Sequence, residues 1–132
     1  MAKAILVVED DPKQLRLIRD LLKISGYKTI EATDGEKGVE LAKRSKPALI
    51  LMDIMMPKMD GYNATYIIKK DKEIKEIPVV MLTGLGFELN RKLAEMMGAD
   101  GYIAKPFSPG QIRELVRQFL GTAICDNSSF SS

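Results

Sequence analysis

The segment ALILMDIMMPKMDG, residues 48–61, decides the fold because it places a carboxylate at the end of a buried stretch. Five apolar residues, 48–52, come directly before Asp53, and a loop sequence ending in Asp60-Gly61 follows it. An unpaired buried carboxylate is costly, or its pKa rises until it is neutral. We therefore expect other charged groups to meet Asp53.

Four more apolar runs rich in β-branched residues lie outside this segment, at 4–8, 27–32, 78–82 and 101–104. Four of the five runs lack polar alternation, which is typical of strands covered on both faces. Helical patterns separate the runs, so strand and helix alternate five times along the chain. This order predicts an α/β fold, a doubly wound parallel sheet between two layers of helices.

Capping residues mark where the helices begin. The predicted starts are Asp11-Pro12, Thr33 with Glu36, Asp60-Gly61 and Ser108 with Gln111, and a fourth helix spans 88–97. Glycines 26, 98 and 121 end three of the helices. We expect one domain over residues 1–121 and a polar, disordered tail over 122–132.

Composition excludes several classes of protein. The chain has 132 residues and a net charge of +2, which gives no general attraction to nucleic acid or anionic membrane. The N-terminal apolar stretch is too short for a membrane span, and the single Cys125 fits a reducing compartment, so we expect a cytoplasmic protein. The chain has no histidine, which excludes Ser-His and Cys-His nucleophiles and imidazole metal sites.

Polar side chains stand at the carboxyl ends of four predicted strands, and these ends share one edge of a parallel sheet. They are Glu9, Asp10 and Asp11 after the first strand, Asp53 after the third, Thr83 after the fourth and Lys105 after the fifth. Each alone has an ordinary structural explanation as a helix cap, a turn or a surface charge. Their joint placement favours a single site.

Clustered carboxylates suit a hard cation such as Mg²⁺. A carboxylate beside such a cation can attack phosphorus and form an aspartyl phosphate. Lys105 and Thr83 would then bind phosphoryl oxygens, because phosphoryl transfer depends on positioning and charge neutralisation. The residues therefore indicate that Asp53 is a nucleophile whose charge is met by a metal ion and a lysine.

The segments ILVVEDD, ALILMDIMMPKMDG, PVVMLTG and GADGYIAKPF resemble the receiver domain of two-component response regulators, including single-domain chemotaxis and cell-cycle regulators. The resemblance implies a flavodoxin-like sheet with strand order 2-1-3-4-5. It implies that Asp53 is the phosphoacceptor and that Glu9, Asp10, Asp53 and the Met55 backbone carbonyl hold Mg²⁺, with Mn²⁺ as the alternative. It also implies a switch pair, Thr83 and Tyr102, and a cis bond before Pro106.

The same resemblance implies a signalling protein that catalyses only its own phosphorylation and slow dephosphorylation. The expected partners are a sensor histidine kinase or histidine phosphotransfer protein and a downstream protein target, with no direct binding of nucleic acid or membrane. The protein would be a monomer or a phosphorylation-dependent dimer.

Several alternatives stay open at this point. The chain could be a receiver cut from a hybrid histidine kinase or a multidomain regulator. A phosphohydrolase of the haloacid dehalogenase type would need a second acid two residues after the nucleophile, where this chain has Met55. Gly84-Leu85-Gly86 follows a strand but lacks the third glycine of a dinucleotide-binding motif. We expect the methionines to fill the core, Met52, Met81 and Met96 among them.

The apolar residues Met55 and Leu85 lead to a prediction about phosphoryl lifetime. In receiver domains these two positions flank the path of the hydrolytic water, and neither side chain can orient a water by hydrogen bonding. The double variant Met55→Asn with Leu85→Glu should shorten the phosphoryl half-life about ten-fold, equivalent to about 1.4 kcal/mol of barrier. Loss of label from the phosphorylated protein measures the rate. A half-life unchanged by both substitutions would mean that apolar shielding does not set the lifetime.

Overall fold

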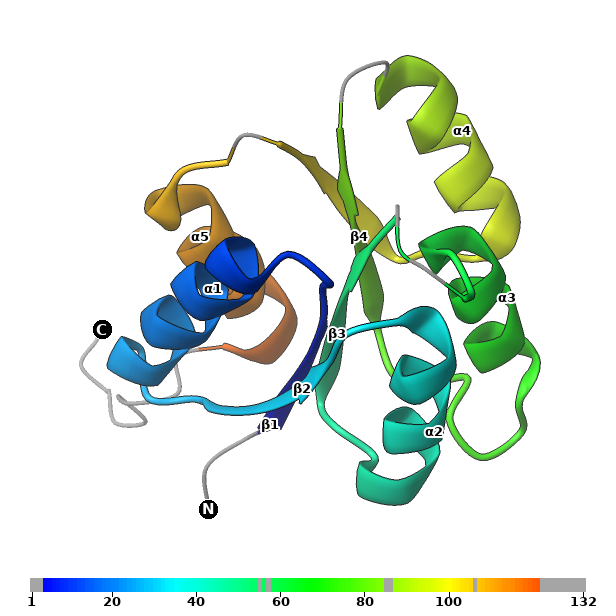
Figure 1. Ribbon diagram of the computed structural model, residues 1–132, viewed down its shortest axis with the longest axis horizontal. Coiled ribbons are helices and arrows are strands. Elements are labelled where there is room, and N and C mark those ends of the chain that lie inside the picture. Colours follow the sequence, from blue (N-terminus) through cyan, green and yellow to red (C-terminus); the bar gives the residue numbers. More distant parts are fainter. Residues whose placement is uncertain (1–3, 55, 57, 85–86, 106, 122–132) are drawn as a thin grey trace.

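Five parallel strands form one sheet in the order β2-β1-β3-β4-β5 (Figure 1). The computed structural model describes residues 4–54, 56, 58–84, 87–105 and 107–121, with the backbone alone at 87–91. The strands are β1 (Ala4–Val8), β2 (Lys28–Ala32), β3 (Leu49–Asp53), β4 (Val79–Thr83) and β5 (Gly101–Ala104). The predicted fold class and strand order are confirmed. The predicted tail at 122–132, with Cys125, lies outside the described residues.

In the described part of the chain, five helices cover the sheet in two layers. They are α1 (Pro12–Ile24), α2 (Gly35–Ser45), α3 (Gly61–Lys70), α4 (Phe87–Met97) and α5 (Pro109–Leu120). Helices α1 and α5 lie on one face of the sheet, and α2, α3 and α4 lie on the other (Figure 1). Helices therefore cover both faces of the sheet, and the strands must present apolar side chains to both.

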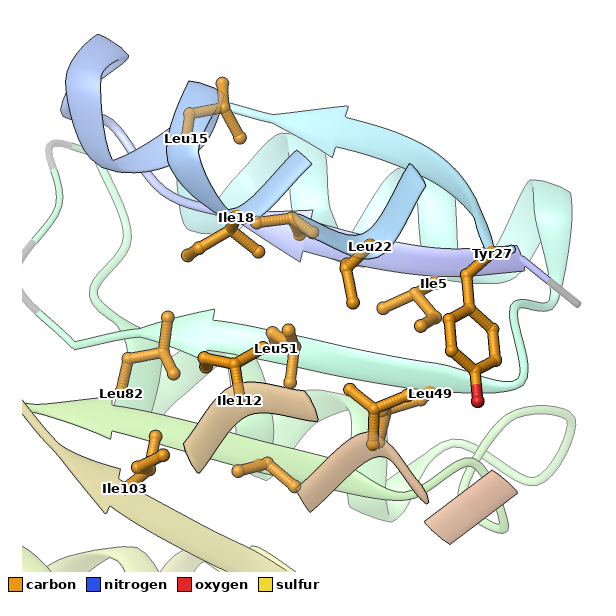
Figure 2. Packing of buried hydrophobic residues seen from close by; sticks show 13 residues of the cluster. Ile5, Leu15, Ile18, Leu22, Tyr27, Leu49, Leu51, Leu82, Ile103 and Ile112 are labelled. Carbon is orange, nitrogen blue, oxygen red and sulfur yellow. The ribbon is translucent and has the colours of Figure 1, made fainter. Parts of the chain in front are cut away.

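Alternate residues of the central strands enter opposite hydrophobic cores, which explains their unbroken apolar runs. In β3, Leu49 and Leu51 join the core under α1 and α5, whereas Ile50 and Met52 join the core under α2, α3 and α4. Leu15, Ile18 and Leu22 of α1 belong to the first core, and Figure 2 shows Ile18 and Leu22 directed towards its strand residues. Full burial of each such side chain stabilises the fold by about 1.5–3 kcal/mol.

Three of the predicted helix starts are confirmed, and one is wrong. Asp11, Asp60 and Ser108 cap α1, α3 and α5, and Ser108 forms the predicted capping box with Gln111. The cap of α2 is Asp34 rather than Thr33, because the Asp34 Oδ1 accepts from the Lys37 N–H at 2.8 Å. The helix accordingly begins at Gly35.

Several strand boundaries and one methionine differ from the prediction. Strands β2, β3 and β4 begin one residue later than predicted. Strands β3 and β4 end one residue later than predicted, so Asp53 and Thr83 are the last residues of their strands. Met52 and Met81 are fully buried, as predicted, but Met96 is 68% exposed. Met96 lies two residues after the buried Ala94, which places it on the opposite side of α4.

At position 61, where α3 begins against the end of β3, a glycine fits and a larger residue does not. A Cβ at Gly61 would overlap the Asp53 carbonyl oxygen and lie 2.9 Å from the Ile54 Cα. Both contacts are to backbone, which cannot rotate away. Gly61 is therefore a constraint on the chain that carries Asp53.

Gly61→Ala should therefore lower the free energy of unfolding by roughly 1–3 kcal/mol, since overpacking must displace backbone. The matched control is Gly110→Ala in α5, where the nearest atom to a new Cβ is the Ser108 Oγ at 3.8 Å. The control should be neutral or stabilising by up to about 1 kcal/mol. Urea unfolding of both variants measures the difference, and equal values would contradict the proposed overlap.

Candidate functional site

The polar residues predicted at the strand ends are brought to one edge of the sheet. The register pairs Val8 of β1 with Met52 of β3, Asp53 with Leu82 of β4, and Thr83 with Ala104 of β5. Glu9 and Lys105 directly follow β1 and β5. All these strands run parallel, so the charged groups that end them lie at the same level.

Three carboxylates form a cluster at this edge. One carboxylate oxygen each from Glu9, Asp10 and Asp53 lies within 4.8 Å of the others. Glu9 is 1% exposed and Asp53 is 5% exposed, while Asp10 is open to solvent. Asp11, predicted beside them, instead caps α1 through its Oδ1 and the Lys13 N–H at 3.1 Å. The cluster thus combines two buried acids with one exposed acid.

The Lys105 ammonium lies between the two buried acids. Its Nζ is 2.8 Å from the Asp53 Oδ1 and 3.2 Å from the Glu9 Oε1. The Lys105 N–H also donates to the Thr83 carbonyl at 2.6 Å, which fixes the end of β5 against β4. The charge at the end of β3 is therefore met by a lysine from the far edge of the sheet.

Burial and charge shift the pKa of two groups here. Burial raises the pKa of Glu9 above its usual value, and the Asp53 charge raises it further. The hydrogen bond from the Asp11 N–H and the charge of Lys105 lower the pKa, but by less. Burial lowers the pKa of Lys105, but hydrogen bonding to Asp53 and the charges of Asp53 and Glu9 outweigh it, so that its pKa is raised. The electrostatics of the site therefore favour a bound cation and oppose any further negative charge that has no cation beside it.

The donor set fits a divalent cation of the Mg²⁺ type. Three carboxylates within 4.8 Å, one of them open to solvent, supply the oxygen ligands that Mg²⁺ prefers while leaving room for water. Asp10 and Asp53 would bind directly, and Glu9, the most buried of the three acids, would act mainly through water. The predicted Met55 carbonyl ligand lies outside the described residues, as do Leu85 and Pro106.

Thr83 and Tyr102, the predicted switch pair, occupy neighbouring strands. The Thr83 hydroxyl is buried and donates to the Ile103 carbonyl at 3.5 Å, so it is directed at β5. Contact with a group on Asp53 would require rotation about its χ1 angle. Tyr102 is half-buried and packs against the core under α2, α3 and α4.

Sequence reasoning missed one residue that shapes the site. Gly61 was predicted only as the first residue of α3, but its backbone lies against the Asp53 carbonyl and its N–H donates to the Ile54 carbonyl at 2.8 Å. The Asp-Gly pair in the sequence signals a helix start or a turn. It carries no signal for this tertiary contact.

Comparison with known proteins gives consistent results. The family model of the response regulator receiver domain matches residues 5–117. The polar-differentiation response regulator DivK of Brucella anthropi is 36% identical over 123 residues, which cover 93% of this chain and 100% of that protein. In the part of the chain that the structure describes, no helix has the length and apolar character needed to cross a membrane.

Solved receiver structures have the same fold. The receiver domain of the sensor histidine kinase PA1611 from Pseudomonas aeruginosa, described with a magnesium ion in its active-site cleft, is 30% identical with a TM-score of 0.85, covering 92% of this chain and 99% of that one. The receiver domain of a signal transduction histidine kinase from Syntrophus aciditrophicus is 30% identical with a TM-score of 0.84, covering 99% and 98%.

Removing the Lys105 ammonium should destabilise the protein in a pH-dependent way. In Lys105→Met, without divalent cations, two buried carboxylates lose their counter-charge, which should cost roughly 3 kcal/mol at neutral pH. The loss should shrink as the pH falls towards the raised pKa of Glu9, because a proton then replaces the ammonium in the folded state but is released on unfolding.

Urea unfolding at neutral and mildly acidic pH measures this effect. Arg117→Met is the control, since it removes only an exposed pair with Glu114 and should change stability little at either pH. A loss in Lys105→Met that does not depend on pH would contradict the coupling to Glu9.

Proposed function

The chain belongs to the response regulator receiver domain family of two-component signalling, and on that basis we propose that Asp53 accepts a phosphoryl group from a phosphohistidine of a partner protein. The observation that carries the proposal is the pairing of a buried strand-end carboxylate with Lys105 at 2.8 Å. These 132 residues contain no histidine, so the phosphohistidine would lie outside them, on a histidine kinase or a histidine phosphotransfer protein.

The transfer forms one bond and breaks one bond. A carboxylate oxygen of Asp53 bonds to phosphorus as the bond from phosphorus to the donor nitrogen breaks, and the electron pair of that bond stays on the imidazole. Lys105 would stabilise the charge on the phosphoryl oxygens, since its ammonium already lies at the acceptor. A bound Mg²⁺, held by Asp10 and Asp53 with Glu9 behind water, would supply further charge neutralisation.

Phosphorylation would then bias a two-state switch. We propose that the Thr83 hydroxyl leaves the Ile103 carbonyl and binds the phosphoryl group, and that Tyr102 fills the space vacated. The face formed by α4, β5 and α5 would change with them and present the protein to its target. The phosphoryl group can shift this equilibrium only by its difference in interaction with the two states.

One alternative keeps support from the comparisons. Two of the similar structures are receivers of histidine kinases, so the same phosphoacceptor chemistry fits a receiver within a hybrid kinase. A dehalogenase-type hydrolase has no comparable support, since the family match covers residues 5–117. Either receiver arrangement uses Asp53 in the same way.

Incubation with a small phosphodonor and Mg²⁺ should add one phosphoryl group to the protein, detected by mass spectrometry as an acid-labile adduct. Asp53→Asn should reduce incorporation to background, because the amide is a poor nucleophile, and EDTA should do the same to the wild-type protein. Asp11→Asn is the matched control, since Asp11 is an exposed neighbouring acid and asparagine keeps the cap of α1. Incorporation at the wild-type rate in Asp53→Asn would refute the assignment.

A further inference from the structure

The loop that follows the phosphoacceptor strand, residues 54–60, is tied to the N-terminus of α2. The Gly61 N–H donates to the Ile54 carbonyl at 2.8 Å and closes the base of the loop. Farther along, the Gly35 N–H donates to the Met59 carbonyl at 3.1 Å. Gly35 is the first residue of α2, where N–H groups have no partner within the helix. The loop thus satisfies a donor of α2, and α2 in turn holds the loop.

Asp34 reinforces the same junction. Its Oδ1 accepts from the Lys37 N–H at 2.8 Å, which fixes where α2 begins, and its Oδ2 lies 3.8 Å from the Lys58 Nζ in the loop. Lys58 has a φ of 67°, a left-handed backbone conformation that residues other than glycine rarely adopt. At Lys58 the loop is therefore held in a backbone conformation that lysine disfavours.

The junction is tightly packed where Gly35 meets Met59, and beside that contact it is open. A Cβ at Gly35 would overlap the Met59 carbonyl oxygen and lie 3.1 Å from the Met59 Cβ. Beside it is a hollow of about 520 Å³ between α2 and the loop, whose lining includes Asp34, Lys37, Val39, Lys43, Lys58 and Met59. The hollow leaves this side of the loop open, so the contacts with Asp34 and Gly35 act together with the packing of Met56 and Met59 against the core to hold the loop.

We propose that Asp34 and Gly35 are positioning residues for the phosphoacceptor site. By holding the loop that continues directly from Asp53, they set the geometry in which the acidic cluster binds a divalent cation and Asp53 receives the phosphoryl group. They touch neither group themselves and act through the backbone of the loop. The proposal rests on the function proposed above.

The principal test compares Gly35→Ala with Gly38→Ala. Both glycines lie on the buried face of α2, but a Cβ at Gly38 would meet the Val8 side chain, at 2.9 Å, rather than the loop backbone. Both variants should lose stability. Only Gly35→Ala should weaken Mg²⁺ binding, about ten-fold, as expected when a group that orients metal ligands is disturbed. Mg²⁺ titrations followed by NMR measure the affinity in protein confirmed to be folded.

A second readout needs neither metal nor phosphate. In Mg²⁺-free protein, Gly35→Ala should speed hydrogen exchange of the Gly61 amide, because displacing Met59 loosens the hydrogen bond that closes the base of the loop. Gly38→Ala should leave that amide protected to the same degree, relative to its global stability, as in the wild type. Equal Mg²⁺ affinities and equal Gly61 protection in the two variants would overturn the proposal.

Substitutions at Asp34 test the junction without adding atoms, in case Gly35→Ala does not fold. Asp34→Ala should weaken Mg²⁺ binding and slow phosphorylation several-fold, whereas Asp34→Asn should restore both, because asparagine keeps the cap. Asp34→Ala with wild-type Mg²⁺ affinity would refute the proposal. If wild-type protein binds Mg²⁺ but acquires no phosphate at Asp53, the proposed function fails, while the effect on Mg²⁺ affinity still decides the role of the junction.

Discussion

A lysine held between two buried carboxylates is the interaction on which the rest of the site depends. Glu9 and Asp53 are almost fully buried, and their charges repel each other, so burying this pair without the Lys105 ammonium would be costly. The three residues come from β1, β3 and the end of β5, and they can meet only if the strands are parallel and end at the same level. The sheet order and the register are therefore requirements of the site.

Much of this arrangement could be predicted because it follows from local pattern. Unbroken apolar runs predict strands buried on both faces, and the alternation of Leu49 and Leu51 with Ile50 and Met52 between two cores shows why the pattern holds. Parallel strands then place their last residues at one edge of the sheet. The meeting of Glu9, Asp53 and Lys105 could therefore be predicted from the sequence.

The features that escaped prediction depend on distances between segments. Asp34 rather than Thr33 caps α2. Both residues can cap a helix, and which of them does so depends on where the helix meets the loop after β3. The contacts of Gly35 with Met59 and of Gly61 with Asp53 join residues whose sequence shows only a turn signal. Met96 fits an apolar pattern but lies on the exposed side of α4. In each case tertiary position decides, and single-sequence patterns do not contain it.

Charge balance indicates what a divalent cation would add to the lysine at this site. With all three carboxylates ionised, the single Lys105 ammonium leaves two negative charges, which a divalent cation would neutralise. Phosphorylation would replace the single charge of Asp53 with a dianionic group, so one negative charge would remain even with that cation bound. The Thr83 hydroxyl, at the end of the adjacent strand, would supply an uncharged donor. Its present bond to the Ile103 carbonyl is long, at 3.5 Å, so little opposes its rotation towards the new charge.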